Sequence, residues 1–285
     1  MTRLADSATH RFRKGVKLGK FAYRRGTASL RALPDFLVIG TQKGGTTYLY
    51  KVLSEHPDVL PAFKKEVHYF DLHYDQGEGW YRAYFPLRAR LTERTITGEA
   101  SPYYLFHPHA PGRAAALLPD AKLIVLLRNP VDRAYSHYQH QVTQWAAEGH
   151  ETLSFEAAVD AEEERLDGEL ARLMHDDVVH SPNFRSYSYL ARGHYVDQLM
   201  AWNEVYDRDQ MLVLKSEDFF ADEPRTLATI LDFLGLASWA PERSVSIPNK
   251  REYSSLSPDL RRRLVDYFEP HNKRLYDYLG TDFGW

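Results

Sequence analysis

The stretch FLVIGTQKGGTTYLY, residues 36–50, decides the fold prediction. Four apolar residues, Phe36 to Ile39, lead into a polar loop rich in glycine, and apolar residues resume at Tyr48. This order predicts a buried strand, a tight loop and the start of a helix, with loop amides free to hold an anion. It is the usual setting of a phosphate-binding loop.

The loop departs from that of a nucleotide triphosphatase. Gly40 and Gly45 have the P-loop spacing, but Thr46 and Thr47 follow them, and the only lysine, Lys43, lies inside the loop. In a triphosphatase, the lysine after the second glycine reaches the outer phosphates and the next hydroxyl holds magnesium. We therefore expect a shorter nucleotide without a metal, and a Lys43 that stabilises charge on a bridging oxygen as a group departs. An ordinary glycine-rich turn is the structural alternative.

Composition excludes several classes of function. The chain has 285 residues, enough for one large domain or two small ones, and its 36 basic and 39 acidic side chains give no preference for nucleic acid. The absence of cysteine excludes disulfides, thiolate metal sites and cysteine nucleophiles. No apolar run approaches the roughly 20 residues that span a bilayer, and the N-terminus has no signal-peptide core. We expect a cytoplasmic protein.

Residues 1–33 form a predicted basic arm, in which Asp6 is the only acidic residue. Its basic residues are Arg3, Arg11, Arg13, Lys14, Lys17, Lys20, Arg24, Arg25 and Arg31. One interpretation is a solvated or partly disordered tail. The other is a basic surface helix that meets anionic lipid or a polyanionic substrate.

After this arm, apolar runs alternate with helical patterns. The runs 36–40, 95–101, 121–130 and 210–219 are predicted strands. The predicted helices are Thr46 to Ser54, Gly112 to Leu118, Val131 to Trp145, Phe155 to Leu173, Gly193 to Tyr206, Glu223 to Leu234 and Pro258 to Leu279. Such alternation indicates an α/β fold, a P-loop-like open parallel sheet flanked by helices. We expect one domain over residues 34–285, with a mobile, charged middle at about 145–185.

A second segment, residues 123–141, runs from a predicted strand into a predicted helix. Arg128 lies at the strand end and Ser136 about two turns into the helix, so both could reach one phosphate. The guanidinium would supply a bidentate clamp. An Arg128 that is only a surface charge is the alternative.

Together these segments resemble the sulfotransferases that use 3′-phosphoadenosine 5′-phosphosulfate (PAPS). The resemblance covers roughly residues 35–280 and is greatest to the heparan sulfate-type branch, especially its N-sulfotransferase domain. The matching tracts are TQKGGTT, KKEVHYFD, GEASPYYLF, AAALLPDAKLIVLLRNPVDRAYSHYQHQ, RGHYVDQL, DFLGL and PNKREYS.

The resemblance implies roles for particular residues. The 5′-phosphosulfate site would comprise Lys43, Gly44, Gly45, Thr46 and Thr47, and the 3′-phosphate site Arg128 and Ser136. A loop closing over the 3′-phosphate would contribute Asn249, Lys250 and Arg251, and residues 192–199 would pack beside the nucleotide.

The general base is predicted at Glu66, where the heparan sulfate-type branch places it. Apolar neighbours would raise the pKa of this carboxyl, whereas Lys64 and Lys65 would lower it. A surface acid paired with one of these lysines is the alternative. His140 is the second choice, because it lies four residues after Ser136 on one helix face and the branch has an assisting histidine there.

Two further observations limit the chemistry. The histidines have no spacing typical of a zinc helix motif, so we expect no metal at His68, His107, His109, His137 or His140. Where the heparan sulfate-type enzymes carry Glu-Lys-Ser, this chain has Glu99, Ala100 and Ser101. The departure leaves the donor chemistry intact and removes a lysine that would face an acidic sugar.

The sequence thus predicts an enzyme, a PAPS-dependent sulfotransferase that acts on a hydroxyl, or less readily an amine, of a glycan, glycolipid or small metabolite. A P-loop kinase using ATP and magnesium is the alternative, and a nucleotide- or glycan-binding protein without catalysis is a third hypothesis. The partners would be the donor and the acceptor, with no nucleic acid, and the basic arm could add peripheral membrane contact. Residues 71–94 and 145–190 are the predicted acceptor loops. Their aromatic residues could stack on the acceptor or form a satellite core: Trp80, Tyr81, Tyr84, Trp145 and Tyr187.

Overall fold

The structure is a computed structural model that describes residues 19–145, 151–175, 180–241 and 256–285. Within these residues, five parallel strands form one sheet in the order β2-β3-β1-β4-β5. The strands are β1 (Phe36–Gly40), β2 (Val59–Pro61), β3 (Ile96–Ala100), β4 (Lys122–Leu127) and β5 (Met211–Lys215). The prediction of an open parallel α/β sheet is confirmed, with β2 as the one strand that was not predicted.

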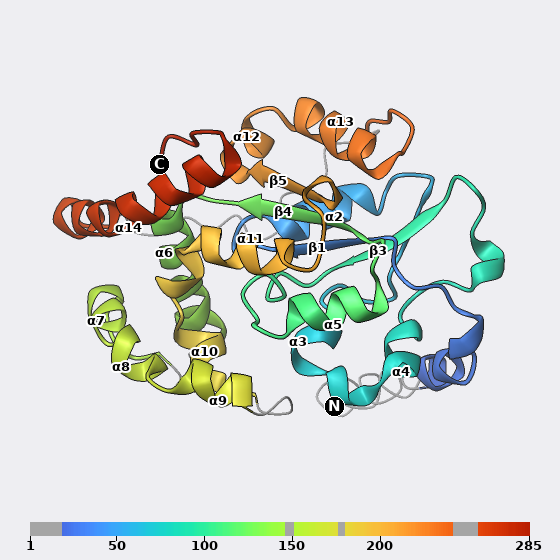
Figure 1. Cartoon of the computed structure of the whole chain (residues 1–285), viewed down its shortest axis with the longest axis horizontal. Helices are drawn as coiled ribbons and strands as arrows, with labels where there is room; N and C mark the ends of the chain where they lie inside the picture. The colour runs from blue at the N-terminus through green and yellow to red at the C-terminus, as the bar shows by residue number, and fades with distance from the viewer. Residues whose placement is uncertain (1–18, 146–150, 176–179, 242–255) are drawn as a thin grey trace, which may run out of the picture.

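Helices cover both faces of this sheet (Figure 1). The longer ones are α2 (Thr46–Leu53), α5 (Ala110–Leu117), α6 (Pro130–Trp145), α11 (Tyr195–Asn203), α13 (Glu223–Leu234) and α14 (Pro258–Leu279). The shorter ones are α3 (Tyr69–Leu72), α4 (Glu78–Arg82), α7 (Phe155–Asp160), α8 (Glu162–Leu166), α9 (Glu169–His175), α10 (Pro182–Tyr187) and α12 (Ser216–Ala221). The 3₁₀ helices are η1 (Ala28–Leu30), η2 (Tyr74–Gln76), η3 (Arg88–Arg90), η4 (Ala191–Gly193) and η5 (Arg208–Gln210).

The central strands are buried on both faces, as their continuous apolar runs predict. In β1, Leu37 and Ile39 face a core shared with α5, α11 and α14. Phe36 and Val38 face the opposite core, which contains side chains of α2, α12 and α13. This two-residue alternation holds the strand rigidly and fixes the position of the loop that follows it.

The helix predicted over Phe155 to Leu173 is wrong as a single element. The chain forms three short helices there, α7, α8 and α9. Gly168 adopts a φ of 69°, a left-handed conformation that interrupts a right-handed helix. With α10, these helices make up the described part of the charged middle.

The described part of the predicted basic arm packs on the body of the protein. Residues 19–26 are helical, and Phe21 contacts the rings of Trp80 and Tyr84, with centroid distances of 6.3 and 4.9 Å. Arg24 donates hydrogen bonds to the carbonyls of Ala83 and Phe85. Residues 1–18 lie outside the described residues.

Candidate active site

The glycine-rich loop of residues 41–45 lies at the topological switch point of the sheet. From β1 the chain passes to β2 and β3 on one side, and it returns to β4 on the other side. Ligands of open α/β sheets bind at the carboxyl ends of strands where the order reverses in this way. Residues 41–45 follow β1 there, and Arg128 follows β4.

Two glycines are required by the shape of this loop. A Cβ on Gly44 would lie 2.4 Å from the carbonyl oxygen of Leu126, so no larger residue fits beside β4. Gly45 adopts a φ of 99° immediately before α2 begins at Thr46. The first amides of a helix have no partner within it and can bind an anion. The geometry is that of a phosphate cradle.

The loop is held by side chains from distant parts of the chain. Arg128 donates a hydrogen bond from Nη1 to the carbonyl of Lys43 over 3.1 Å. Ser216 donates from Oγ to the carbonyl of Gly44 over 2.7 Å. The structure therefore brings together the predicted 5′ loop and the predicted 3′ arginine.

Helix α6 begins at a well-capped end beside this loop. The side-chain oxygen of Asn129 accepts hydrogen bonds from the amides of Val131 and Asp132 over 3.0 and 3.2 Å. This cap fixes the start of the helix that carries Ser136, which is 5 % exposed, and the half-buried His140.

His137, between these two residues, packs in the interior. It is fully buried, its ring lies 5.0 Å from that of Tyr189, and burial holds its pKa well below the ordinary value of 6.5. The positive charges of nearby groups, among them Lys43 and His140, lower this pKa further. His137 is therefore a packing residue of the interior.

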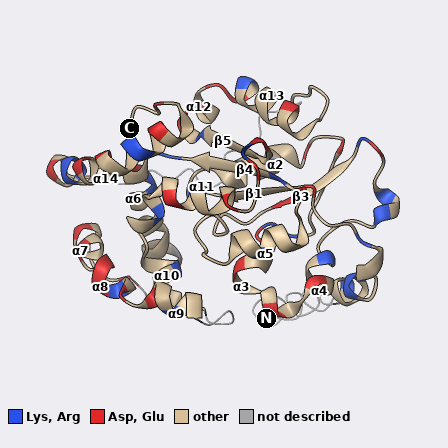
Figure 2. Cartoon of the chain, in the orientation of Figure 1, with Lys and Arg blue, Asp and Glu red and all other residues tan. Residues whose placement is uncertain are grey.

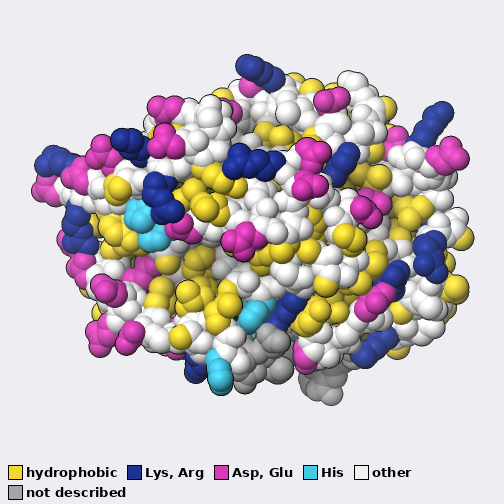
Figure 3. Space-filling view, in the orientation of Figure 1, with side chains coloured by type: hydrophobic (Ala, Val, Ile, Leu, Met, Phe, Trp, Pro, Cys, Tyr) yellow, Lys and Arg dark blue, Asp and Glu magenta, His cyan; other side chains and the backbone are white. Residues whose placement is uncertain are grey.

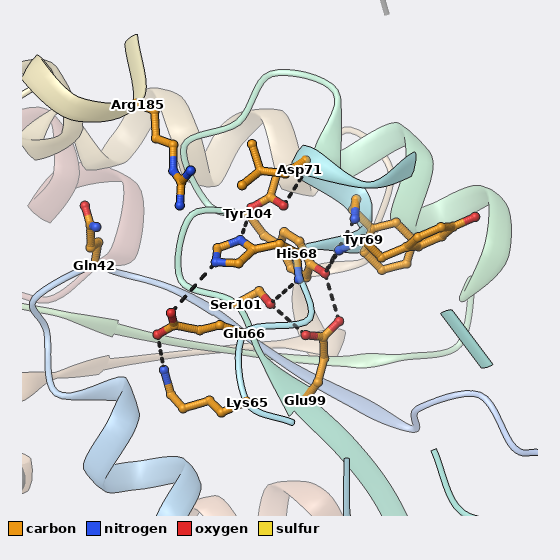
Figure 4. A network of polar contacts seen from close by, with 12 residues as sticks. Gln42, Lys65, Glu66, His68, Tyr69, Asp71, Glu99, Ser101, Tyr104 and Arg185 are labelled. Atoms are coloured by element: carbon orange, nitrogen blue, oxygen red, sulfur yellow. Dashed lines mark hydrogen bonds and ion pairs between the residues drawn. The ribbon is translucent and has the colours of Figure 1, made fainter. Parts of the chain in front are cut away.

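Glu66 takes part in a network of charged side chains (Figure 4). Lys65 donates a hydrogen bond from Nζ to Oε1 of Glu66. Oε2 of Glu66 lies 3.8 Å from Nε2 of His68. On the other side of the His68 ring, Nδ1 lies 2.8 Å from Oδ2 of Asp71, which is 2 % exposed. The imidazole thus bridges two carboxylates.

The network determines the charge of each member. Burial raises the pKa of Glu66, but the contact with His68 and the positive charge of Lys65 outweigh burial and lower it to about 2. Burial lowers the pKa of His68, but Asp71 and then Glu66 outweigh it and raise it to about 9. At neutral pH, Glu66 is a carboxylate and His68 an imidazolium.

Residues at the end of β3 hold this network in place through hydrogen bonds. The amide of His68 donates a hydrogen bond to Oγ of Ser101 over 3.1 Å, and Ser101 in turn donates to Glu99 over 2.7 Å. Glu99 is fully buried and also accepts from the hydroxyls of Tyr81 and Tyr104 over 2.8 and 2.9 Å. Glu99 and Ser101 therefore orient His68, whereas Ala100 beside them is buried in the opposite core.

The backbone is strained at three positions of this site. In the described chain, the non-glycine residues with positive φ are Lys43 at 71°, Glu66 at 59° and His68 at 59°. Side chains with a Cβ avoid this region, at a cost of roughly 1–2 kcal/mol each. Such strain clusters at functional sites, where surrounding contacts maintain it. Two of the three strained residues are predicted catalytic residues.

A pocket of about 610 Å³ lies beside the network. Its walls come from the two predicted acceptor loops, through residues 72–76 and residues 173 and 180–187, and from Tyr103 and His107. Tyr187 lines this pocket. Trp80 and Tyr81 instead stack on Tyr69, and Trp80 contacts Tyr84. Tyr81 is part of the core that contains Leu37 and Ile39, and Trp80 and Tyr84 pack against it. Of Trp145 only the backbone is described.

Sequence reasoning missed the residues that join the donor loop to the pocket. Arg192 is 1 % exposed, stacks on Tyr103 with its guanidinium 4.6 Å from the ring centroid, and donates hydrogen bonds to the side chain of Gln42 and the carbonyl of Arg185. In Figure 4, Gln42 and Arg185 approach the region of Glu66 and His68 from other elements. The one available signal was the arginine of the RGHYVDQL tract.

Asn249, Lys250 and Arg251 lie in residues 242–255, outside the described residues. Among the side chains that the structure describes, no group of three or more His, Asp or Glu is arranged to hold a metal ion.

A glycine-rich cradle at the switch point of a parallel sheet, with an arginine from the next strand, defines a P-loop-like nucleotide-dependent transferase. A model of the sulfotransferase domain matches residues 33–258, and the chain belongs to this family. Membership of this family does not favour the P-loop kinase alternative.

Individual relatives agree with this assignment. The chain is 30 % identical to mouse (Mus musculus) heparan sulfate glucosamine 3-O-sulfotransferase 3A1, over 90 % of the chain and 65 % of that protein. It is 26 % identical to the membrane-associated sulfotransferase kil1 of Dictyostelium discoideum, over 90 % of the chain and 67 % of that protein. A solved sulfotransferase from Alicyclobacillus acidocaldarius superposes with a TM-score of 0.68 at 32 % identity, over 88 % of this chain and 98 % of the other. The chain thus spans about two thirds of these curated relatives, and the resemblance to the heparan sulfate-type branch is confirmed.

The cytoplasmic location expected from the sequence is contradicted by these comparisons, because one of these relatives is a membrane-associated sulfotransferase. The absence of cysteine and of a long apolar run from the sequence does not determine the cellular location of the protein. In the part of the chain that the structure describes, no helix combines the length and the apolar character needed to cross a bilayer.

Proposed function

We propose that this enzyme transfers a sulfuryl group from PAPS to a hydroxyl, or less readily an amine, of a glycan, glycolipid or small metabolite. The observation that carries the proposal is the position of the Lys43 loop, which lies at the switch point and is tied to Arg128. A bisphosphorylated nucleotide has two anionic ends, and this arrangement offers one cationic site for each.

The residues present fit the donor. Gly44 and Gly45 have no Cβ to meet the carbonyl oxygen of Leu126 and the ring of Phe220, so the loop can make the tight turn of a phosphate cradle. Arg128 is partly exposed just after β4 and contacts the carbonyl of Lys43, and Ser136 is buried in α6, the helix that follows. These positions support a nucleotide with a 5′ group on the loop and a 3′-phosphate at the start of α6.

The reaction would be an in-line displacement at sulfur. The acceptor oxygen forms a bond to sulfur, and the bond between sulfur and the bridging oxygen of the 5′-phosphate breaks. The departing phosphate keeps the electron pair, and the ammonium group of Lys43 stabilises the added charge. The acceptor proton passes to Glu66, which is ionised.

The acceptor would occupy the pocket of about 610 Å³ between residues 72–76 and α10. This volume suits one or two rings of a sugar or aryl compound. Relatives of this chain are named for heparan sulfate, but Ala100 is fully buried and offers no charge to an acidic sugar. We therefore infer an acceptor that is not restricted to heparan sulfate.

Transfer from ³⁵S-labelled PAPS to a panel of glycans, glycolipids and small hydroxyl compounds tests this function. The variant Asn183→Trp is the matched probe, because Asn183 is exposed and lines the pocket. It should raise the acceptor KM several-fold and leave the donor Kd unchanged. Absence of labelled product with every acceptor class, or equal effects on donor and acceptor, would contradict the proposal.

Peripheral membrane contact by the basic N-terminal residues remains a prediction. The relative from Dictyostelium that is named membrane-associated favours it.

A further inference from the structure

A basic surface outside the pocket lining is not used by the proposed chemistry. It is formed by residues 19–31 and 88–94, and we refer to it as the basic edge. Its exposed cationic side chains are Lys20, Arg25, Arg88, Arg90 and Arg94. Figure 2 shows Lys and Arg gathered along this edge, at the right of the view.

The two segments are joined into one surface by direct contacts. Arg88 donates a hydrogen bond to the carbonyl of Ser29. Burial, and then the positive charges of Arg31 and Arg90, lower the pKa of Arg24 to about 10. Residues 19–34 contain no acidic side chain, and residues 82–94 contain only Glu93. The surface therefore carries a concentrated positive charge.

Apolar side chains are exposed on and beside these segments. Tyr23 is 65 % exposed and Leu30 is 59 % exposed. Phe63 is 44 % exposed and lies under the guanidinium of Arg24, 4.8 Å from it. Figure 3 shows hydrophobic side chains between the basic ones along this edge. A surface that only binds polyanions gains nothing from exposed apolar groups, whereas a lipid interface accommodates both kinds.

We propose that the basic edge docks onto an anionic lipid bilayer. The arginines and Lys20 lie against the phosphate headgroups, and Tyr23, Leu30 and Phe63 enter the boundary between headgroups and acyl chains. Helical residues 19–26 already pack on Trp80 and Tyr84, so the surface is formed before it meets the membrane. The interaction is independent of sulfuryl transfer.

The test is sedimentation of the full chain with vesicles of phosphatidylcholine alone or with 30 % phosphatidylglycerol. Binding should require the anionic lipid and fall steeply with added salt. Arg90→Glu with Arg94→Glu should weaken it at least about ten-fold, since each basic side chain near an anionic surface contributes about five-fold. The control is Arg225→Glu with Arg262→Glu, two exposed arginines of α13 and α14, which should bind as the unaltered protein does.

A second variant separates a bilayer from an acidic polysaccharide. Tyr23→Ser with Leu30→Ser removes exposed apolar groups and no charge, so it should weaken vesicle binding several-fold and leave heparin binding unchanged. Activity on a soluble acceptor should be unchanged in the apolar variant and in the α13 and α14 control. The proposal is overturned if phosphatidylcholine vesicles bind equally, if the α13 and α14 control loses as much binding, or if the apolar variant binds vesicles normally.

Discussion

Nδ1 of His68 lies 2.8 Å from Oδ2 of Asp71, a carboxylate that is almost completely buried. The opposite nitrogen of the ring faces Glu66 at 3.8 Å. A charged imidazole between two carboxylates holds the side chain of Glu66 in place and keeps it ionised. The arrangement makes His68 a positioning residue for the proposed base.

The first prediction concerns the protonation of His68. Its folded pKa of about 9 lies above the ordinary 6.5, so the pair with Asp71 stabilises the fold fully below pH 6.5. This contribution, on the order of 3 kcal/mol at most, is lost as the pH rises through about 9. Asp71→Asn should move the pKa toward 6.5 and flatten the loss of stability at alkaline pH. Histidine NMR titration with denaturation at several pH values checks both, and an unchanged His68 pKa in this variant would refute the pairing.

The second prediction compares Glu66 with His140. Glu66→Gln keeps the shape and removes the basicity, so the rate should fall by on the order of 10²–10⁴, with little change in nucleotide binding. Because the pKa of Glu66 is about 2, the rate loss should be uniform between pH 5 and 8. His140→Ala should be the milder change. The opposite ranking in steady-state kinetics would assign the base to His140 and leave Glu66 as the partner of Lys65.

The third prediction concerns Lys43. Lys43→Ala should reduce kcat by on the order of 10²–10³ and change the donor Kd much less, because its charge is needed mainly as the bridging oxygen gains charge. Lys51→Ala is the matched control, since Lys51 is an exposed lysine of α2, the helix that follows the loop. If kcat of Lys43→Ala stays within a few-fold of the control, Lys43 does not act on the leaving group.

The fourth prediction concerns Arg128, which would bind the 3′-phosphate. Arg128→Ala should weaken the binding of adenosine 3′,5′-bisphosphate at least ten-fold and weaken the binding of adenosine 5′-phosphate far less. Some loss is expected for both nucleotides, because Arg128 also donates to the carbonyl of Lys43. Isothermal titration with the two nucleotides measures the difference, and equal losses would exclude a 3′ site at this residue.

Much of the fold could be predicted because it depends on local pattern. The run Phe36 to Ile39 is apolar at every position, and the glycines after it are required by contacts of one loop. Strand β2 could not be predicted, since it has three residues and ends at Pro61, and its pairing with β3 rather than its sequence defines it. The break at Gly168 was overlooked because the surrounding pattern is helical.

Candidate site residues with a recognisable local order could be found in the sequence in the same way. Lys43 and Glu66 lie in tracts with a recognisable order, and the structure places both at strained positions of one sheet edge. The contact between Arg192 and Gln42 joins residues 150 positions apart, and no local pattern reports it. The bridge of His68 between two carboxylates likewise depends on how the backbone folds at residues 66–71, where two of the residues have positive φ.

The central claim is that the switch-point loop binds a 3′-phosphorylated nucleotide and not a triphosphate. Thermal-shift titration of the unaltered chain compares adenosine 3′,5′-bisphosphate with ATP and magnesium. A ligand that binds only the folded state raises the melting temperature with concentration. We predict stabilisation by the bisphosphate and none by ATP with magnesium. Stabilisation by ATP with magnesium and none by the bisphosphate would contradict the sulfotransferase account.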